Sequence, residues 1–91
     1  MLTSDVQILK LVEKLKELGR IRYDTDFCAE VGISKQHFYN IKKQANGEGK
    51  QNYHFTLQHA ETICRKYGVD GNYIFGLTDQ PFKLKPKAVK Q

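Results

Sequence analysis

The stretch from Phe27 to Ile41 constrains the fold of this chain more than any other. Its large apolar residues are spaced as in two short amphipathic helices joined by a tight turn: Phe27, Val31, Ile33, Phe38 and Ile41. Gly32 stands where the first helix would end, and a positive φ costs glycine little. Cys28 is small enough for the two helices to cross closely, and Ser34 is a good N-cap for the second. The stretch therefore predicts a helical pair.

Three further helices are predicted around this pair, which itself spans about 24–31 and 34–44. Residues 4–18 have an apolar stripe that consists of Ile8, Leu11, Val12, Leu15 and Leu18. Thr56 is the predicted N-cap of a helix over 57–67, with an inner face of Leu57, Ala60, Ile63, Cys64 and Tyr67. Asp70 precedes a short fifth helix that we expect to contain Tyr73, Ile74, Phe75 and Leu77. No segment has a convincing strand pattern, so the fold class is predicted to be all-α.

The size and composition of the chain limit its class. Its 91 residues suit one domain, predicted over 4–79, followed by a tail at 80–91. We expect no membrane partner, because no apolar run approaches the ~20 residues of a membrane span. The N-terminus lacks the pattern of a signal peptide, so a cytoplasmic location is expected. Cys28 and Cys64 both fall at apolar helical positions, which predicts buried thiols and no disulfide framework.

The net charge of +5 is unevenly distributed along the chain. Residues 32–50 contain four lysines and one glutamate, whereas residues 21–31 contain three acidic residues and one arginine. The tail adds four lysines and two prolines and is expected to be basic and flexible. A concentrated basic surface favours a polyanionic partner through counterion release, although it also suits a merely solvated surface.

The downstream sequence makes the helical pair part of a larger pattern. Leu57-Gln58-His59-Ala60-Glu61-Thr62-Ile63 is followed by Tyr67-Gly68-Val69-Asp70 and then by Asn72-Tyr73-Ile74-Phe75-Gly76-Leu77. Together with the 27–41 spacing, this resembles the phage-repressor and Cro-type helix-turn-helix family, the lambda-repressor-like domain, over residues 5–79. The resemblance implies a compact five-helix domain whose second and third helices form the helix-turn-helix. It also implies a sequence-specific DNA-binding transcriptional regulator that binds double-stranded DNA as a homodimer.

The resemblance places the recognition helix at about 34–44, in the major groove. Base contacts are expected from its exposed positions: Lys35, Gln36, Tyr39 and Asn40. Lysine suits guanine, and glutamine and asparagine suit adenine. Contacts to the DNA backbone are expected from Thr25, Ser34, Lys42, Lys43 and Lys50. The loop from Ala45 to Phe55 is longer than is usual in the family. A dimer surface is expected at the fifth helix, with Tyr73, Phe75 and Phe82.

Other functions have weaker support in the sequence. The three histidines and two cysteines lack the local spacing of a metal site, and no glycine-rich phosphate loop is present, so neither metal nor cofactor is expected. We expect no enzymatic activity and no small-molecule effector. The alternative function is a protein-interaction module, such as an antitoxin or a phage accessory factor, that retains the fold without DNA binding. Asp24, Asp26 and Glu30 in the second helix favour this alternative.

Overall fold

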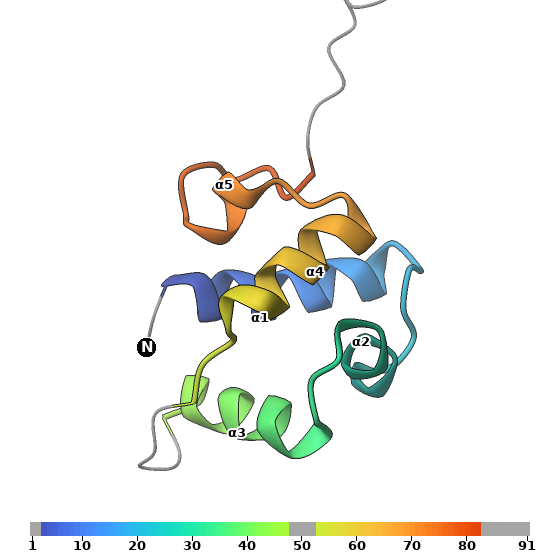
Figure 1. Ribbon diagram of the computed structural model, residues 1–91, viewed down its shortest axis with the longest axis vertical. Helices are drawn as coiled ribbons and strands as arrows, with labels where there is room; N and C mark the ends of the chain where they lie inside the picture. Colours follow the sequence, from blue (N-terminus) through green and yellow to red (C-terminus); the bar gives the residue numbers. More distant parts are fainter. Residues whose placement is uncertain (1–2, 48–52, 83–91) are drawn as a thin grey trace, which may run out of the picture.

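Five α-helices form the part of the chain that the computed structural model describes, residues 3–47 and 53–82 (Figure 1). Their bounds are α1 Thr3–Glu17, α2 Asp24–Val31, α3 Lys35–Ala45, α4 Leu57–Tyr67 and α5 Gly71–Ile74. Within these ranges no strand is present, and the single β-type contact is an isolated antiparallel bridge between Val69 and Phe82. The all-α prediction is confirmed. No described helix has the length and apolarity needed to cross a membrane.

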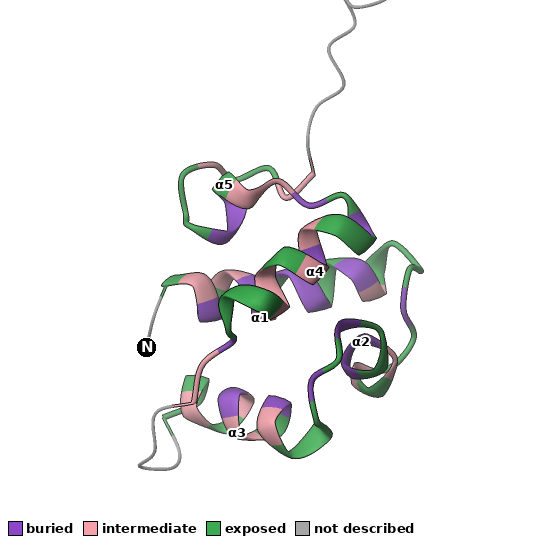
Figure 2. Cartoon of the chain, in the orientation of Figure 1, coloured by how far each residue is buried: buried purple, intermediate pink, exposed green. Residues whose placement is uncertain are grey.

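The core forms around α1, whose apolar stripe faces the other helices. Ile8, Leu11 and Leu15 are completely buried, and α1 contacts both α3 and α5. Phe27 of α2 lies with its ring centroid 5.7 Å from that of Phe38 in α3. It also stacks on Tyr67 of α4, at 6.1 Å. Figure 2 shows the buried residues on the inward faces of the helices. Burial of this shared apolar surface fixes how the helices pack.

The helix ends follow the capping residues that the sequence predicted. Gly32 adopts a φ of 81°, and the N–H groups of Gly32 and Ile33 both donate to the Cys28 carbonyl, at 2.9 and 3.1 Å. Ser34 Oγ accepts from the His37 N–H at 3.1 Å. Thr56 caps α4 in the same way, by accepting from the N–H three residues ahead. The turn between α2 and α3 is therefore three residues long, and α3 ends one residue later than predicted.

Three predictions about apolar residues were wrong. Leu18 is 55% exposed, because α1 ends at Glu17 and the chain turns at Gly19. Leu57 is 79% exposed, because it occupies the first position of α4, at the edge of the stripe that buries Ile63 and Tyr67. The fifth helix ends at Ile74, so that Phe75 and Leu77 lie after it and not within it. Both side chains are exposed, as the expected surface requires of Phe75.

The two predicted buried thiols differ from one another. Cys28 is 3% exposed and lies in the core of the helical pair, as expected. Cys64 is only half-buried, on the side of α4 that packs against the edge of the core.

Candidate nucleic-acid interface

The outward face of α3 is polar and basic. Lys35, Gln36, Tyr39 and Lys43 are exposed on it, and Asn40 is half-buried beside them. These positions repeat at helical spacing and therefore share one face of the helix. The helix contains three lysines and no acidic residue. Its inner face holds Phe38 and Ile41, which fix it to the core. This arrangement presents cations and amides outward from a firmly packed helix.

Two side-chain pairs order this outward face. Gln36 Nε2 donates a hydrogen bond to Asn40 Oδ1, 3.1 Å away. Lys43 Nζ lies 5.3 Å from the ring centroid of Tyr39, within the range of a cation–π interaction. Residues four apart on a helix are neighbours, so each pair restricts the rotamers of both partners. This hydrogen bond uses neither the Gln36 side-chain carbonyl nor the Asn40 amide hydrogens, so these groups remain available to a ligand.

One flank of α3 is tied to residues 53–56, the segment that leads into α4. The side chain of Gln44 forms two hydrogen bonds with the backbone of Tyr53: Nε2 donates to its carbonyl at 3.1 Å, and Oε1 accepts from its N–H at 2.8 Å. His37 Nε2 donates to the His54 carbonyl at 2.8 Å. Both ends of α3 are thus attached to segment 53–56 by polar contacts.

Segment 53–56 is in turn attached to α1 through Asp5, whose side chain is fully buried. Its Oδ1 accepts from the backbone N–H of Phe55 at 2.9 Å. Its Oδ2 accepts from His54 Nδ1 at 2.6 Å. A buried carboxylate needs such partners, because an unpaired charge in the core is costly. Asp5 therefore connects the first turn of α1 to the segment that holds α3.

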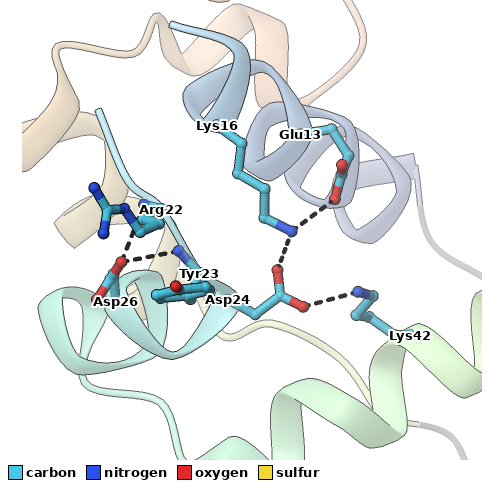
Figure 3. A network of polar contacts seen from close by, with 7 residues as sticks. All are labelled: Glu13, Lys16, Arg22, Tyr23, Asp24, Asp26 and Lys42. Atoms are coloured by element: carbon cyan, nitrogen blue, oxygen red, sulfur yellow. Dashed lines mark hydrogen bonds and ion pairs between the residues drawn. The ribbon is translucent and has the colours of Figure 1, made fainter. Parts of the chain in front are cut away.

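The opposite flank of α3 is held by a cluster of two lysines around one carboxylate, drawn in Figure 3. Lys42 Nζ of α3 lies 2.9 Å from Asp24 Oδ2, and Lys16 Nζ of α1 lies 2.6 Å from Asp24 Oδ1. Burial opposes ionisation of Asp24, but its contacts with the two lysines outweigh it and lower its pKa. The contact with Asp24 also raises the pKa of Lys16. This cluster joins α1, α2 and α3.

The other acidic residues of α2 also have intramolecular partners. The Asp26 carboxylate accepts from the backbone N–H groups of Arg22 and Tyr23, at 3.0 and 2.9 Å (Figure 3). These contacts lower the pKa of Asp26. Glu30 accepts a hydrogen bond from the Tyr67 hydroxyl. Burial and this bond together raise the pKa of Tyr67, so its hydroxyl keeps its proton at neutral pH.

Most of the predicted interface residues lie together on the outward face of α3. The base-contact candidates Lys35, Gln36, Tyr39 and Asn40 share one face with Lys43. Ser34 and Thr25 are exposed, and Ser34 Oγ accepts its capping bond while its hydroxyl hydrogen remains available as a donor. Lys42 differs, because Asp24 holds its ammonium group. Lys50 and the basic tail from residue 83 onward lie outside the described residues.

Sequence reasoning missed the residues that support this face from behind. Asp5 and His54 are far apart in the chain, and Gln44 looked like an ordinary polar helix position. Lys42 was expected to contact the DNA backbone and not Asp24. No local motif marks such pairs, although a carboxylate in the first turn of an apolar helix is a weak signal. Among the described residues, no group of three or more histidine, cysteine or acidic side chains is placed to hold a metal ion.

Comparison of the chain with protein-family models, with curated proteins and with solved structures gave no match.

Proposed function

We propose that α2, the turn at Gly32–Ser34 and α3 act as a helix-turn-helix, with α3 as the recognition helix in the major groove of double-stranded DNA. The protein would then be a sequence-specific transcriptional regulator of the lambda-repressor-like type. The observation that supports this most is the exposed face of α3, which combines cations and amides without any acidic residue. The major groove is wide enough to admit such a helix.

The chemistry of the face suits both parts of DNA recognition. Gln36 and Asn40 offer the donors and acceptors that match the N6 and N7 edge of adenine, and Lys35 suits the O6 and N7 edge of guanine. Tyr39 lies on the same face of α3 as these three residues and can contact a sugar or a thymine methyl group. Lys43 is placed for a phosphate, as are the exposed Ser34 and Thr25 at the starts of α3 and α2.

The positions of the acidic residues weigh against the alternative of a protein-interaction module. Their number in α2 favoured an acidic docking surface. However, Asp24 pairs with two lysines, Asp26 accepts backbone N–H groups, and Glu30 binds the Tyr67 hydroxyl. All three acidic side chains of α2 thus have partners within the molecule, and two lysines offset the charge of Asp24. This makes the basic face of α3 the stronger candidate for the surface that meets the partner.

We further propose that the protein binds DNA as a homodimer, as near-palindromic operators require of this type of domain. The expected surface changes at two residues. Tyr73 is 7% exposed and belongs to the core, and Phe82 is half-buried against the core. Phe75 and Leu77 are exposed after α5, and Leu57 is exposed at the start of α4. A groove of about 300 Å³ between α4 and α5 is lined by Leu57 and Phe75 among others.

Fluorescence anisotropy with a labelled random duplex, at 50 and 200 mM salt, tests the DNA-binding proposal. We expect binding at low salt that weakens steeply as salt rises, because each phosphate neutralised releases counterions. Selection from a randomised duplex pool should then enrich one sequence. An absence of binding at low salt would contradict the proposal and favour the protein-interaction module.

A further inference from the structure

Lys42 lies at a position of α3 that suits a DNA-backbone contact, but its ammonium group is bound within the protein. It lies seven residues after Lys35, which places both lysines along the same edge of the helix. By position alone, Lys42 would extend the basic face toward a DNA backbone. Its side chain is instead only 35% exposed, and its ammonium nitrogen lies 2.9 Å from Asp24 Oδ2.

Asp24 is built into the junction of three helices. Its carboxylate is 30% exposed and binds one lysine with each oxygen, as Figure 3 shows. The two contacts come from different helices, α1 and α3, so the carboxylate cannot leave one partner without disturbing the other. A carboxylate and a phosphate are both anionic oxygen ligands for an ammonium group. Asp24 therefore binds the Lys42 ammonium group, which a DNA phosphate could otherwise bind.

The ion pair between Asp24 and Lys42 affects how well the protein would distinguish its specific DNA site from random DNA. Sequence-independent affinity for DNA grows with the number of phosphates that lysines neutralise, and base contacts add to it only at the right site. If one lysine does not contact the DNA backbone, the sequence-independent affinity is lower, whereas the base contacts are unaffected. We propose, on the basis of the function inferred above, that Asp24 is a specificity-determining residue that withholds Lys42 from the DNA backbone.

The substitution Asp24→Asn tests this with nearly unchanged shape. Glu13→Gln is the matched control, because Glu13 also contacts Lys16, at 3.3 Å, and both changes remove one negative charge. Each variant is titrated with a random duplex between 50 and 200 mM salt, and folding is checked by thermal melting. For Asp24→Asn we expect tighter binding at low salt and a slope of log K against log salt that is steeper by about 0.9, one extra phosphate.

That slope corresponds to an additional loss of affinity of about 3-fold between the two salt concentrations. Glu13→Gln should leave the slope close to that of the wild type. The double variant Asp24→Asn/Lys42→Met should return to the wild-type slope, because it lacks the released Lys42 while Lys16 keeps its contact with Glu13. On the selected site, Asp24→Asn should discriminate less well against random DNA. Equal slopes for Asp24→Asn and Glu13→Gln would overturn the proposal, and so would weaker binding by a folded Asp24→Asn variant.

A second pair of variants keeps the test decisive if Asp24→Asn does not fold. Lys43→Met should reduce the wild-type salt slope by about 0.9, whereas Lys42→Met should change it much less. Equal reductions would show that Lys42 already contacts phosphate in the wild type, which contradicts the proposal. Failure of every protein to bind DNA would instead contradict the DNA-binding function itself, so the two failures are distinguishable.

Discussion

At the scale of single residues, the amide pair on α3 is the part of the proposed interface with the clearest chemical role. We expect Gln36→Ala and Asn40→Ala each to cost about 1–3 kcal/mol on the selected DNA site, because each would remove a proposed base-edge contact. Binding to random duplex should change little. Since Gln36 donates to Asn40, the double variant should cost less than the sum of the two single ones.

Anisotropy titrations of the selected and random duplexes measure these effects. Gln58→Ala is a suitable control, since Gln58 is exposed and belongs to α4 and not to the proposed recognition helix. Loss of affinity on random DNA equal to the loss on the selected site would contradict the assignment of the two amides to base recognition.

Asp5 is the residue whose role in stability the structure defines most sharply. Asp5→Ala leaves the Phe55 N–H and the His54 ring without their acceptor, so we expect a loss of about 1–3 kcal/mol in the free energy of unfolding. Urea denaturation followed by circular dichroism measures it. Glu17→Ala, on the exposed side of the same helix, should change stability by less than about 0.5 kcal/mol. Equal effects of the two substitutions would argue against the buried contacts.

At the scale of helices, the sequence contains enough information to locate each element. Caps and glycine stops act over three or four residues, so Ser34, Thr56, Asp70, Gly32 and Gly68 could be recognised without knowledge of the tertiary structure. The errors occurred at helix ends. Leu18 and Leu57 fit the apolar spacing, yet each lies where no neighbouring element covers it. Periodicity identifies a face of a helix but not the length of the surface that packs on it.

The start of α4 gives this protein a predictable response to pH. His59 Nδ1 accepts from the Thr56 N–H, so the ring at this position is neutral. Burial lowers the pKa of His59 from 6.5, and the nearby His37 acts in the same direction. The folded state therefore binds fewer protons than the unfolded state. The contribution of His59 to stability is complete above pH 6.5 and is lost as the pH falls through its lowered pKa.

Urea denaturation at pH 7.5, 6.0 and 5.0 tests this response. His59→Gln is the informative variant, because glutamine at this position can still accept from the Thr56 N–H but does not titrate. Its stability should decrease less than that of the wild type between pH 7.5 and 5.0. The lowered carboxylate pKa values of Asp24 and Asp26 act at lower pH and do not interfere in this range. Identical pH dependences would contradict the role of His59.

At the scale of the whole molecule, the proposed recognition helix depends on contacts that local sequence cannot reveal. Its outward residues were predictable, because helical spacing alone separates Lys35, Gln36 and Tyr39 from Phe38 and Ile41. The residues that hold this helix in place were not predictable. Segment 53–56 on one flank and Asp24 on the other come from parts of the chain whose proximity arises only after folding. The composition of the proposed interface therefore follows from the sequence of one helix, whereas its orientation follows from the packing of α1, α2 and α3.

We expect two copies of the chain to associate at the groove between α4 and α5. Phe75 and Leu57 line this groove with their large apolar side chains exposed to water, and burial of such a patch favours self-association. Phe75→Glu and Leu57→Glu should shift the protein toward monomer in sedimentation velocity. They should also weaken binding to a palindromic selected site far more than to a single half-site.

Leu18→Glu is the matched control, because Leu18 is a similarly exposed leucine that belongs to neither helix of the groove. It should leave both sedimentation and the preference for the palindrome unchanged. If all three glutamate variants behave alike, or if the wild type stays monomeric at high concentration and binds one half-site as tightly as two, the α4–α5 surface is not where two copies meet.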